Sequence, residues 1–297
     1  MKLLNYYRYF FILSIVILLA GVISLAVFGL KLGIDFKGGS VTELQFNQPY
    51  NIDKLREVVS KQGIENPQIQ STDNNGVIIR TADQNEEKHK ALLIAFKSDI
   101  GEFTEKSYQS IGPVVGEQLT RQALYQLLLV SLGIVFYIGY AFRKVAKPIS
   151  SWQFGIAAII SLLHDLLVVL GIFSILGHFF HIEVDSMFVT AMLTVLGFSV
   201  HDTIIVFDRI RENLRVYAGQ SIEFVVNHSI SQTLVRSLNT SITVLLVLLA
   251  LLLFGGETIR YFVLALFIGI MAGTYSSIFV ASPILVLWQN WKLKRRK

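Results

Sequence analysis

The stretch that decides the fold is Met187–Asn213, MFVTAMLTVLGFSVHDTIIVFDRIREN. Its first part is apolar and long enough to cross a bilayer, and it ends in a charged run that starts at Asp208. The pair His201-Asp202 lies inside the apolar part, shortly before that charged run. A carboxylate at the centre of a membrane helix costs roughly 2.5–3.5 kcal/mol on insertion scales, so such a residue indicates a functional site. Asp202 is therefore the first candidate.

The composition predicts a membrane protein with one polar domain. Of the 297 residues, 53% are hydrophobic and only 16% are charged, whereas soluble proteins have about a quarter of their residues charged. The absence of cysteine excludes disulfides, thiolate metal sites and a cysteine nucleophile.

Charge is distributed unevenly along the chain. Residues 34–120 contain 9 Lys and Arg against 13 Asp and Glu, a net charge of −4, and the remainder contains 17 against 8, a net charge of +9. In a membrane protein a basic excess usually reports topology, so we do not expect nucleic-acid binding.

Six apolar segments are each long enough for a transmembrane helix, which needs roughly 20 residues. They cover residues 10–30, 119–142, 152–176, 187–207, 233–254 and 261–288. The first segment could instead be a signal peptide, but its length and the lack of a convincing cleavage site favour an uncleaved helix.

The polar residues between the first two spans predict a small α+β domain. We expect strands at 41–46, 67–71, 77–81 and 106–111, and helices at 52–61 and 86–100. Asn51 is the expected N-cap of the first of these helices, and Asp73-Asn74-Asn75-Gly76 predicts a hairpin turn because Asn-Gly accepts positive φ. The order βαββαβ is typical of the ferredoxin-like arrangement, which indicates a shape and not an activity.

The expected domains are a first transmembrane helix (1–32), a ferredoxin-like domain (33–117) and a five-helix transmembrane domain with a basic C-terminal tail (118–297). With the N-terminus in the cytoplasm, the cytoplasmic segments hold nearly all of the basic residues of the helical part, in agreement with the positive-inside rule. These residues are Lys2, Arg8, Arg143, Lys144, Lys147, Arg209, Arg211, Arg215 and the basic residues of the tail at 292–297. Both termini are therefore expected in the cytoplasm and the α+β domain outside it.

Arg236 is the second candidate because it lies near the start of the fifth apolar segment. Asp202 and Arg236 both fall within roughly one or two helical turns of the cytoplasmic boundary, so their pairing is geometrically feasible. Thr240 follows Arg236 at i+4 and Ser199 precedes Asp202 at i−3, so two polar stripes could form a hydrated path. The alternatives are a static ion pair, or an arginine that extends to the lipid headgroups.

His164-Asp165 in the third apolar segment is a further candidate, near the expected midplane. Histidine and aspartate in one membrane bundle are usual components of a proton relay, and His201 could join it. The alternative is hydrogen bonding between helices that only stabilises the bundle.

Three weaker patterns favour structural roles. His178-x-x-His181 has no obvious third metal ligand, and Gly269-x-x-x-Gly273-x-x-x-Ser277 allows close helix contact. Gly38-Gly39 lacks the Lys-Ser/Thr context of a phosphate-binding loop and precedes a strand, so we exclude phosphate binding there.

Five motifs together resemble the SecF family, the smaller half of the SecD–SecF accessory complex of bacterial protein export. They cover essentially the whole chain and occur in the family's order. The matching stretches are Gly33-Ile34-Asp35-Phe36-Lys37-Gly38-Gly39, Leu163-His164-Asp165, residues 197–213, Arg236-Ser237-Leu238-Asn239-Thr240-Ser241 and Gly273-Thr274-Tyr275-Ser276-Ser277.

The resemblance implies half of an RND-type transporter, whose six helices pair with six from SecD and which is not an enzyme. It also implies that the proton-motive force promotes late steps of preprotein export across the cytoplasmic membrane. Asp202 matches the family's essential membrane aspartate and Arg236 its arginine in helix five. His201 departs from the family, where Asn is common, so its role in the path stays open.

The resemblance further implies partners, namely SecD, the SecYEG translocon, a YidC-type insertase, YajC and an unfolded preprotein outside the cytoplasm. No cofactor is implied; H⁺ is the expected coupling ion, with Na⁺ as the alternative.

Three other functions fit the sequence less well. An RND-like exporter of small molecules or lipids would need more room than one βαββαβ unit provides. A purely structural translocon subunit would use its membrane charges only for assembly. An intramembrane hydrolase is disfavoured because neither HExxH nor GxSxG occurs.

Overall fold

The structure is a computed structural model that describes residues 7–64, 67–72, 74–81, 86–143 and 149–295. The chain forms two compact units, one made of Met1–Lys31 with Tyr125–Lys297 and one made of Leu32–Leu124. Lys2, Asp73, Lys144, Lys147 and the last two residues lie outside the described part, and with them a share of the basic residues on which the topology prediction rests.

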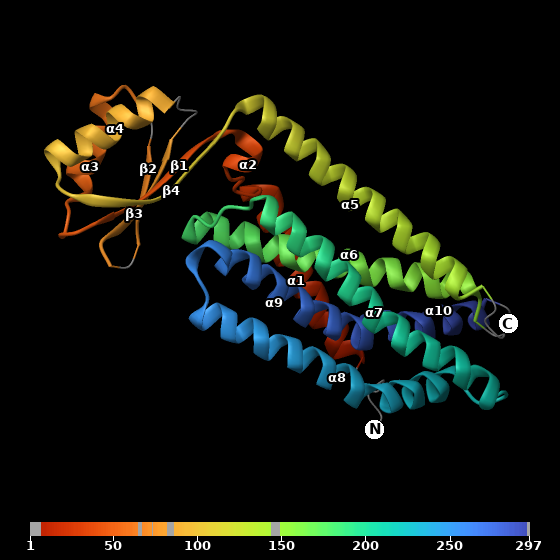
Figure 1. The fold of residues 1–297 in the computed structure, drawn as a ribbon. Helices are drawn as coiled ribbons and strands as arrows, with labels where there is room; N and C mark the ends of the chain where they lie inside the picture. Colours follow the sequence, from red (N-terminus) through yellow and green to blue (C-terminus); the bar gives the residue numbers. More distant parts are fainter. Residues whose placement is uncertain (1–6, 65–66, 73, 82–85, 144–148, 296–297) are drawn as a thin grey trace. The chain divides into compact units, whose positions relative to one another are not determined.

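The smaller unit is built on a four-stranded antiparallel sheet with the strand order β2-β3-β1-β4. Two helices alternate with the strands in the chain order βαββαβ that the sequence predicts (Figure 1). The elements are β1 (Gly39–Phe46), α3 (Ile52–Lys61), β2 (Gln68–Thr72), β3 (Gly76–Thr81), α4 (Glu86–Asp99) and β4 (Phe103–Ile111).

One face of this sheet packs against both helices. Leu44 of β1, Ile79 of β3, Leu55 of α3 and Phe96 of α4 are almost completely buried in a single apolar cluster. The expected cap is confirmed, because the side chain of Asn51 accepts a hydrogen bond of 2.8 Å from the backbone N–H of Asp53.

The hairpin between β2 and β3 has its left-handed residues one position earlier than the sequence suggests. Asn74 and Asn75 have φ of 56° and 58°, whereas Gly76 already belongs to β3. Asparagine is one of the few residues that tolerate this conformation, so the turn uses Asn-Asn in place of Asn-Gly.

Gly38 and Gly39 join the short helix α2 (Ile34–Lys37) to β1, and both have positive φ, of 75° and 131°. A Cβ atom on Gly39 would lie 2.8 Å from the carbonyl oxygen of Thr81, and one on Gly116 would lie 2.9 Å from the backbone nitrogen of Gly38. Positive φ and close backbone contacts therefore account for Gly38 and Gly39, and binding of a phosphate is not needed to explain them.

The larger unit contains helices long and apolar enough to cross a membrane, six of them among the described residues, as expected from the sequence. They are α1 (Tyr7–Phe28), α5 (Pro113–Ala141), which begins in the smaller unit, α6 (Ser151–Phe180), α7 (Ser186–Val216), α8 (Ile222–Phe254) and a last span made of α9 (Glu257–Ser276), η2 (Ser277–Ala281) and α10 (Ser282–Lys294). Several run past the apolar segments, because a helix continues where charged side chains lie outside the hydrocarbon.

The last span contains one π-helical turn, η2, which the sequence does not predict. The hydroxyl of Ser282 donates to the carbonyl of Ser277, five residues earlier, at 3.0 Å. Turns of this kind occur mostly as single insertions in α-helices and often near functional sites.

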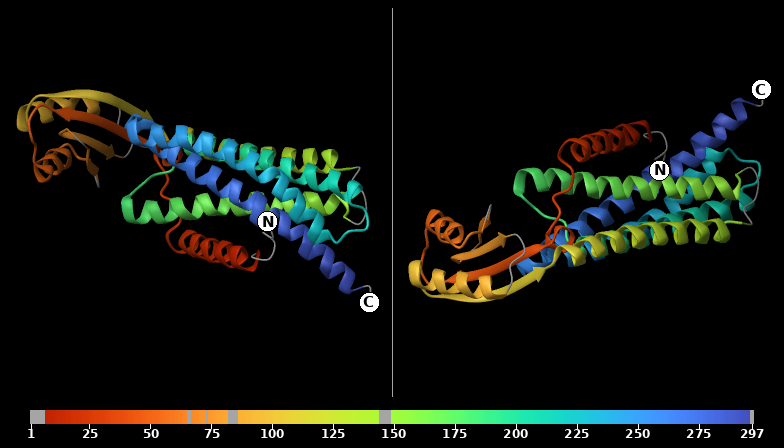
Figure 2. Two further views of the ribbon diagram at one scale, coloured as in Figure 1. Left: turned by 90° about the horizontal axis from the view of Figure 1, so that it is seen from below. Right: turned by 90° about the horizontal axis from the view of Figure 1, so that it is seen from above.

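Helix contacts depend on small residues. A Cβ atom on Gly171 of α6 would collide with the Cα atom of Gly21 in α1, and Ser24 and Ser174 are hydrogen-bonded at 2.8 Å beside this crossing. Helix α1 accordingly lies along α6 (Figure 2). A Cβ atom on Gly273 of α9 would lie 2.9 Å from the Cβ atom of Ser199 in α7, so the expected small-residue stripe does allow close contact.

Candidate functional site

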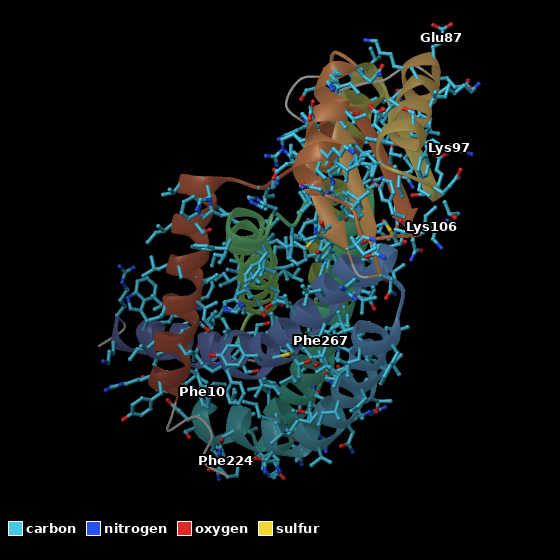
Figure 3. All side chains as sticks on the ribbon, turned by 90° about the vertical axis from the view of Figure 1, so that its left-hand side faces the viewer. Phe10, Glu87, Lys97, Lys106, Phe224 and Phe267 are labelled. Carbon is cyan, nitrogen blue, oxygen red and sulfur yellow. The ribbon has the colours of Figure 1, made fainter. Side chains whose placement is uncertain are left out.

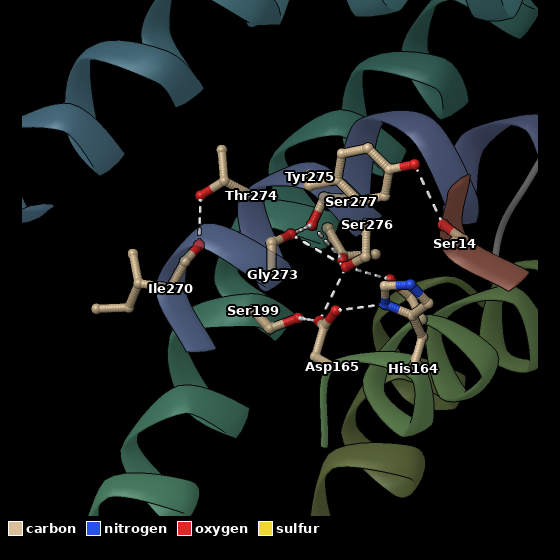
Figure 4. Close-up of polar contacts among 12 residues, drawn as sticks. Ser14, His164, Asp165, Ser199, Ile270, Gly273, Thr274, Tyr275, Ser276 and Ser277 are labelled. Carbon is tan, nitrogen blue, oxygen red and sulfur yellow. Dashed lines mark hydrogen bonds and ion pairs between the residues drawn. The ribbon is translucent and has the colours of Figure 1, made fainter. Parts of the chain in front are cut away.

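Asp165 lies at the centre of the bundle with every hydrogen-bonding demand met. It is completely buried on α6, and its Oδ2 accepts hydrogen bonds from Ser199 of α7 at 2.5 Å and from Ser276 of α9 at 2.9 Å (Figure 4). Ser161 in turn donates to Ser276 at 2.9 Å. One carboxylate thus connects three helices, which fits a group that stabilises the bundle.

His164 completes this arrangement. Its Nδ1 lies 3.0 Å from Asp165 Oδ1, and its ring stacks on that of Tyr275 with the centroids 6.2 Å apart. The hydroxyl of Tyr275 donates to the backbone carbonyl of Phe10 in α1, at 2.7 Å. His164 Nε2 is buried without a hydrogen-bond partner among the described residues, so this pair keeps one unused nitrogen.

Asp202, three residues after Ser199 on α7, has the opposite environment. Its side chain is about as buried as that of Asp165, with 1% exposed, yet neither carboxyl oxygen has a hydrogen-bond partner among the described residues. The hydroxyls of Ser237 and Ser241 of α8 and of Thr274 of α9 lie near the carboxyl, but none of them has the distance and angle of a hydrogen bond to it. A buried carboxyl without partners is costly, particularly when it is charged.

Helix α8 has two different polar faces. Ser229, Thr233, Ser237 and Ser241 follow one another at four-residue spacing and are all buried, so this hydroxyl face is turned towards the neighbouring helices. Arg236 lies on the other, exposed face, and within the described part of the chain it forms no ion pair with Asp202. The expected pairing is absent from this structure because Ser237, and not Arg236, faces the carboxyl.

The remaining candidates are exposed. His201 lies on the outer face of α7, although it is next to the buried Asp202. Thr240 is exposed on α8, and its hydroxyl donates to the carbonyl of Arg236 at 3.0 Å, inside its own helix. The structure therefore brings His164 and Asp165 together and leaves Asp202, Arg236, His201 and Thr240 outside that cluster.

Further hydroxyl groups of α7, α8 and the last span are hydrogen-bonded to one another. Thr203 of α7 and Ser277 of η2 are hydrogen-bonded at 2.9 Å, and Thr274 donates to Ser241 at 2.6 Å. Polar groups thus lie on each of the three helices that pack against α9: Asp165 on α6, Ser199 and Thr203 on α7, and Ser241 on α8. Sequence reasoning included Thr203, Ser237, Ser241 and Ser276 only as members of the matching motifs and gave them no role, although the four-residue spacing of hydroxyls on α8 was a readable signal.

Within the described residues, no group of three His, Asp or Glu side chains is placed to hold a metal ion. His178 stacks on Phe28 with centroids 3.8 Å apart, and His181 adopts a left-handed conformation with φ of 58° at the end of α6. His178 thus forms an aromatic contact, and His181 ends a helix.

Two families match the chain. Residues 92–291 match the family described as "Protein export membrane protein SecD/SecF, C-terminal". Residues 23–49, which include Gly38 and Gly39, match the "SecD/SecF GG Motif". The steric demands on those two glycines supply a physical reason for that motif.

Curated relatives match the chain over most of its length and most of their own. A "Protein translocase subunit SecF" from Thermobaculum terrenum is 50% identical over 96% of this chain and 93% of the relative. A protein of the same name from Anaerolinea thermophila is 40% identical, over 95% and 92%.

Among solved structures, SecDF from Thermus thermophilus superposes with a TM-score of 0.85 at 33% identity. A second structure, described as SecDF in a super-membrane-facing form, gives a TM-score of 0.71 at 32% identity. Each comparison covers 98% of this chain, and the chain spans 39% of the SecDF chain.

Proposed function

Because the chain belongs to the SecD/SecF family as a multi-pass translocase subunit of the SecF type, we propose that it couples the proton-motive force to late steps of preprotein export. In this proposal it forms one half of a SecD–SecF complex in the bacterial cytoplasmic membrane, with both termini in the cytoplasm. H⁺ is the coupling ion, and Na⁺ is the alternative that the test below distinguishes.

The observation that carries the proposal is the unpartnered carboxyl of Asp202. A group buried to this extent without a hydrogen bond is accommodated far more readily when a proton removes its charge. Nearby Asp165 has three partners and no comparable reason to exchange a proton. Asp202 is therefore the carboxyl whose charge state the bundle leaves open.

Arg236 would be the partner of Asp202 in a second conformation of the bundle. It directly precedes Ser237, the residue of α8 that faces Asp202, and successive residues of a helix differ by about 100° around the axis. A rotation of α8 by that amount would exchange the hydroxyl for the guanidinium and pair it with an ionised Asp202. The arrangement in the structure then corresponds to the proton-loaded state, and loss of the proton favours the rotated one.

The energy available is sufficient for such a switch. A proton that crosses 100 mV supplies about 2.3 kcal/mol, which shifts a two-state equilibrium by tens of fold. The α+β domain lies between the first two spans in the sequence, so movement of α1 and α5 would be transmitted to it. Its ligand outside the cytoplasm is an unfolded preprotein.

The exposed polar face of α8 favours a partner chain in the membrane. Gln232, Arg236, Asn239, Thr240 and Thr243 are all exposed along one side of a helix that crosses the membrane. The hydroxyls of Thr240 and Thr243 donate to carbonyls of their own helix, and Gln232 accepts from Arg209 and Asn213, but lipid cannot satisfy the guanidinium of Arg236 or the side-chain amide of Asn239. A polar or acidic surface of a partner chain would satisfy both, and SecD supplies it in our proposal. SecYEG, a YidC-type insertase and YajC complete the assembly.

The test is the Asp202→Asn variant in the complex with SecD, assayed for late export of a preprotein with and without a proton gradient. We expect export to lose its dependence on the gradient while the complex still assembles. Dissipating a Na⁺ gradient instead identifies the ion.

A matched control separates coupling from assembly. If Asp202 and Arg236 only stabilise the complex, then Asp202→Asn combined with Arg236→Gln restores gradient-dependent export. If the single variant keeps full gradient dependence, Asp202 is not the coupling residue.

A further inference from the structure

A cleft of about 810 Å³ lies between the start of α1, the start of α8 and helix α10. Its volume is within the range of sites for small molecules. The stacked rings of Phe10 and Phe279, with centroids 4.0 Å apart, join α1 to the last span next to this cleft. Phe10 and Phe224, which start their helices, lie at the same end of the bundle (Figure 3).

The lining of the cleft divides into an apolar part and a polar part. Ile12, Pro283, Val286 and Leu287 form the apolar part, on α1 and α10. The polar part consists of Arg8, Glu223 and Asn290, and the cleft is also lined by Tyr7 and Tyr9. Tyrosines are enriched where a membrane meets water, so this distribution matches the boundary between acyl chains and headgroups.

The charged groups of the cleft are available to a ligand. The amide nitrogen of Asn290 donates to one carboxyl oxygen of Glu223 at 2.6 Å, which fixes the carboxylate, and the side chain of Glu223 has no other hydrogen bond or ion pair within the described residues. Arg8 is exposed and lies over the ring of Tyr7, with its guanidinium carbon 6.0 Å from the ring centroid. Within the described part of the chain, Arg8 and Glu223 do not form an ion pair with each other.

A cation and a fixed anion in one cleft select a ligand that carries both opposite charges. We propose that this cleft binds phosphatidylethanolamine, with the phosphate at Arg8 and the primary ammonium at Glu223. An anionic phospholipid would bring its charge close to Glu223 without compensation. A choline headgroup carries no N–H to donate to that carboxylate. The acyl chains occupy the apolar part, which distinguishes a lipid from free phosphoethanolamine.

This site is independent of the proposed ion coupling, because none of its residues contacts Asp165 or Asp202 in the described structure. Its test is native mass spectrometry of the purified, delipidated full chain after addition of phosphatidylethanolamine, phosphatidylcholine or phosphatidylglycerol with identical acyl chains. We expect the ethanolamine lipid to bind roughly tenfold more tightly than the other two.

Two variants examine the two charges separately. Glu223→Gln keeps an acceptor for Asn290, and we expect it to abolish the preference for ethanolamine over choline. Arg8→Gln should weaken binding of all three lipids.

Glu212→Gln and Lys292→Gln are the controls, because they change exposed charges outside the cleft and should leave the preference for ethanolamine intact. Unchanged thermal unfolding of each variant in the choline lipid shows that it is folded.

Several outcomes would overturn the proposal. Equal or tighter binding of phosphatidylglycerol would mean general attraction to basic residues. A preference for ethanolamine that survives Glu223→Gln would place the selective site elsewhere. Equal binding of all three lipids would mean that the cleft does not select the headgroup, and a doubled mass of the lipid-free chain would mean that a second copy of the chain fills it.

Discussion

The carboxyl groups of Asp165 and Asp202 are buried to the same extent in the same bundle, but they differ in their hydrogen-bond partners. Asp165 accepts hydrogen bonds from side chains of two neighbouring helices and lies against His164, whereas both oxygens of Asp202 are without a partner among the described residues. Serines surround both of them. The difference is one of hydrogen-bond geometry, not of local composition.

This contrast separates two uses of a membrane carboxylate. Asp165 is a junction of α6, α7 and α9, and its cost of burial is offset by its donors. Asp202 retains that cost, which is unusual unless its charge changes or a partner becomes available. In our proposal the first therefore stabilises the bundle and the second couples the ion, and the following predictions challenge that division.

The largest effect is expected from Asp165→Ala. It leaves Ser199, Ser276 and His164 without their shared acceptor, so the free energy of unfolding should fall by about 2–4 kcal/mol. Titration of the purified chain with a denaturing detergent measures this change. The matched Asp202→Ala variant removes no hydrogen bond and should cost less than about 1 kcal/mol. Equal losses in the two variants would contradict the division.

An intermediate effect is expected from Ser276→Ala. It removes one of the two hydroxyl donors to Asp165 and the acceptor of Ser161, and hydrogen bonds between membrane helices contribute about 1 kcal/mol. The same detergent titration should show a loss of that size. Ser231→Ala is the control, since Ser231 is exposed and bonds only a carbonyl of its own helix.

The smallest effect is expected from Ser237→Ala. The hydroxyl of Ser237 is buried, faces Asp202 and has no hydrogen-bond partner within the described residues. Its removal should change the free energy of unfolding by less than about 0.5 kcal/mol. A loss above roughly 1 kcal/mol would show that Ser237 bonds Asp202 in the folded protein, and the contrast with Asp165 would then be reduced.

Local patterns of the sequence predicted much of this architecture. The apolar segments identified the spans, because a length of about 20 residues is imposed by the bilayer itself. The Asn51 cap and the βαββαβ order follow from side-chain spacing over a few residues. Asp165 and Asp202 could be recognised as exceptional from their apolar surroundings alone.

Only the tertiary structure decided which of these groups have partners. The donors to Asp165 are 34 and 111 residues away in the chain, so no local pattern reports them. Arg236 and Ser237 are neighbours in sequence, and the packing of α8 against α7 and α9 determines that the serine is buried and the arginine exposed. Periodicity shows that a helix has two faces, but the face that is buried depends on the shapes of the helices beside it.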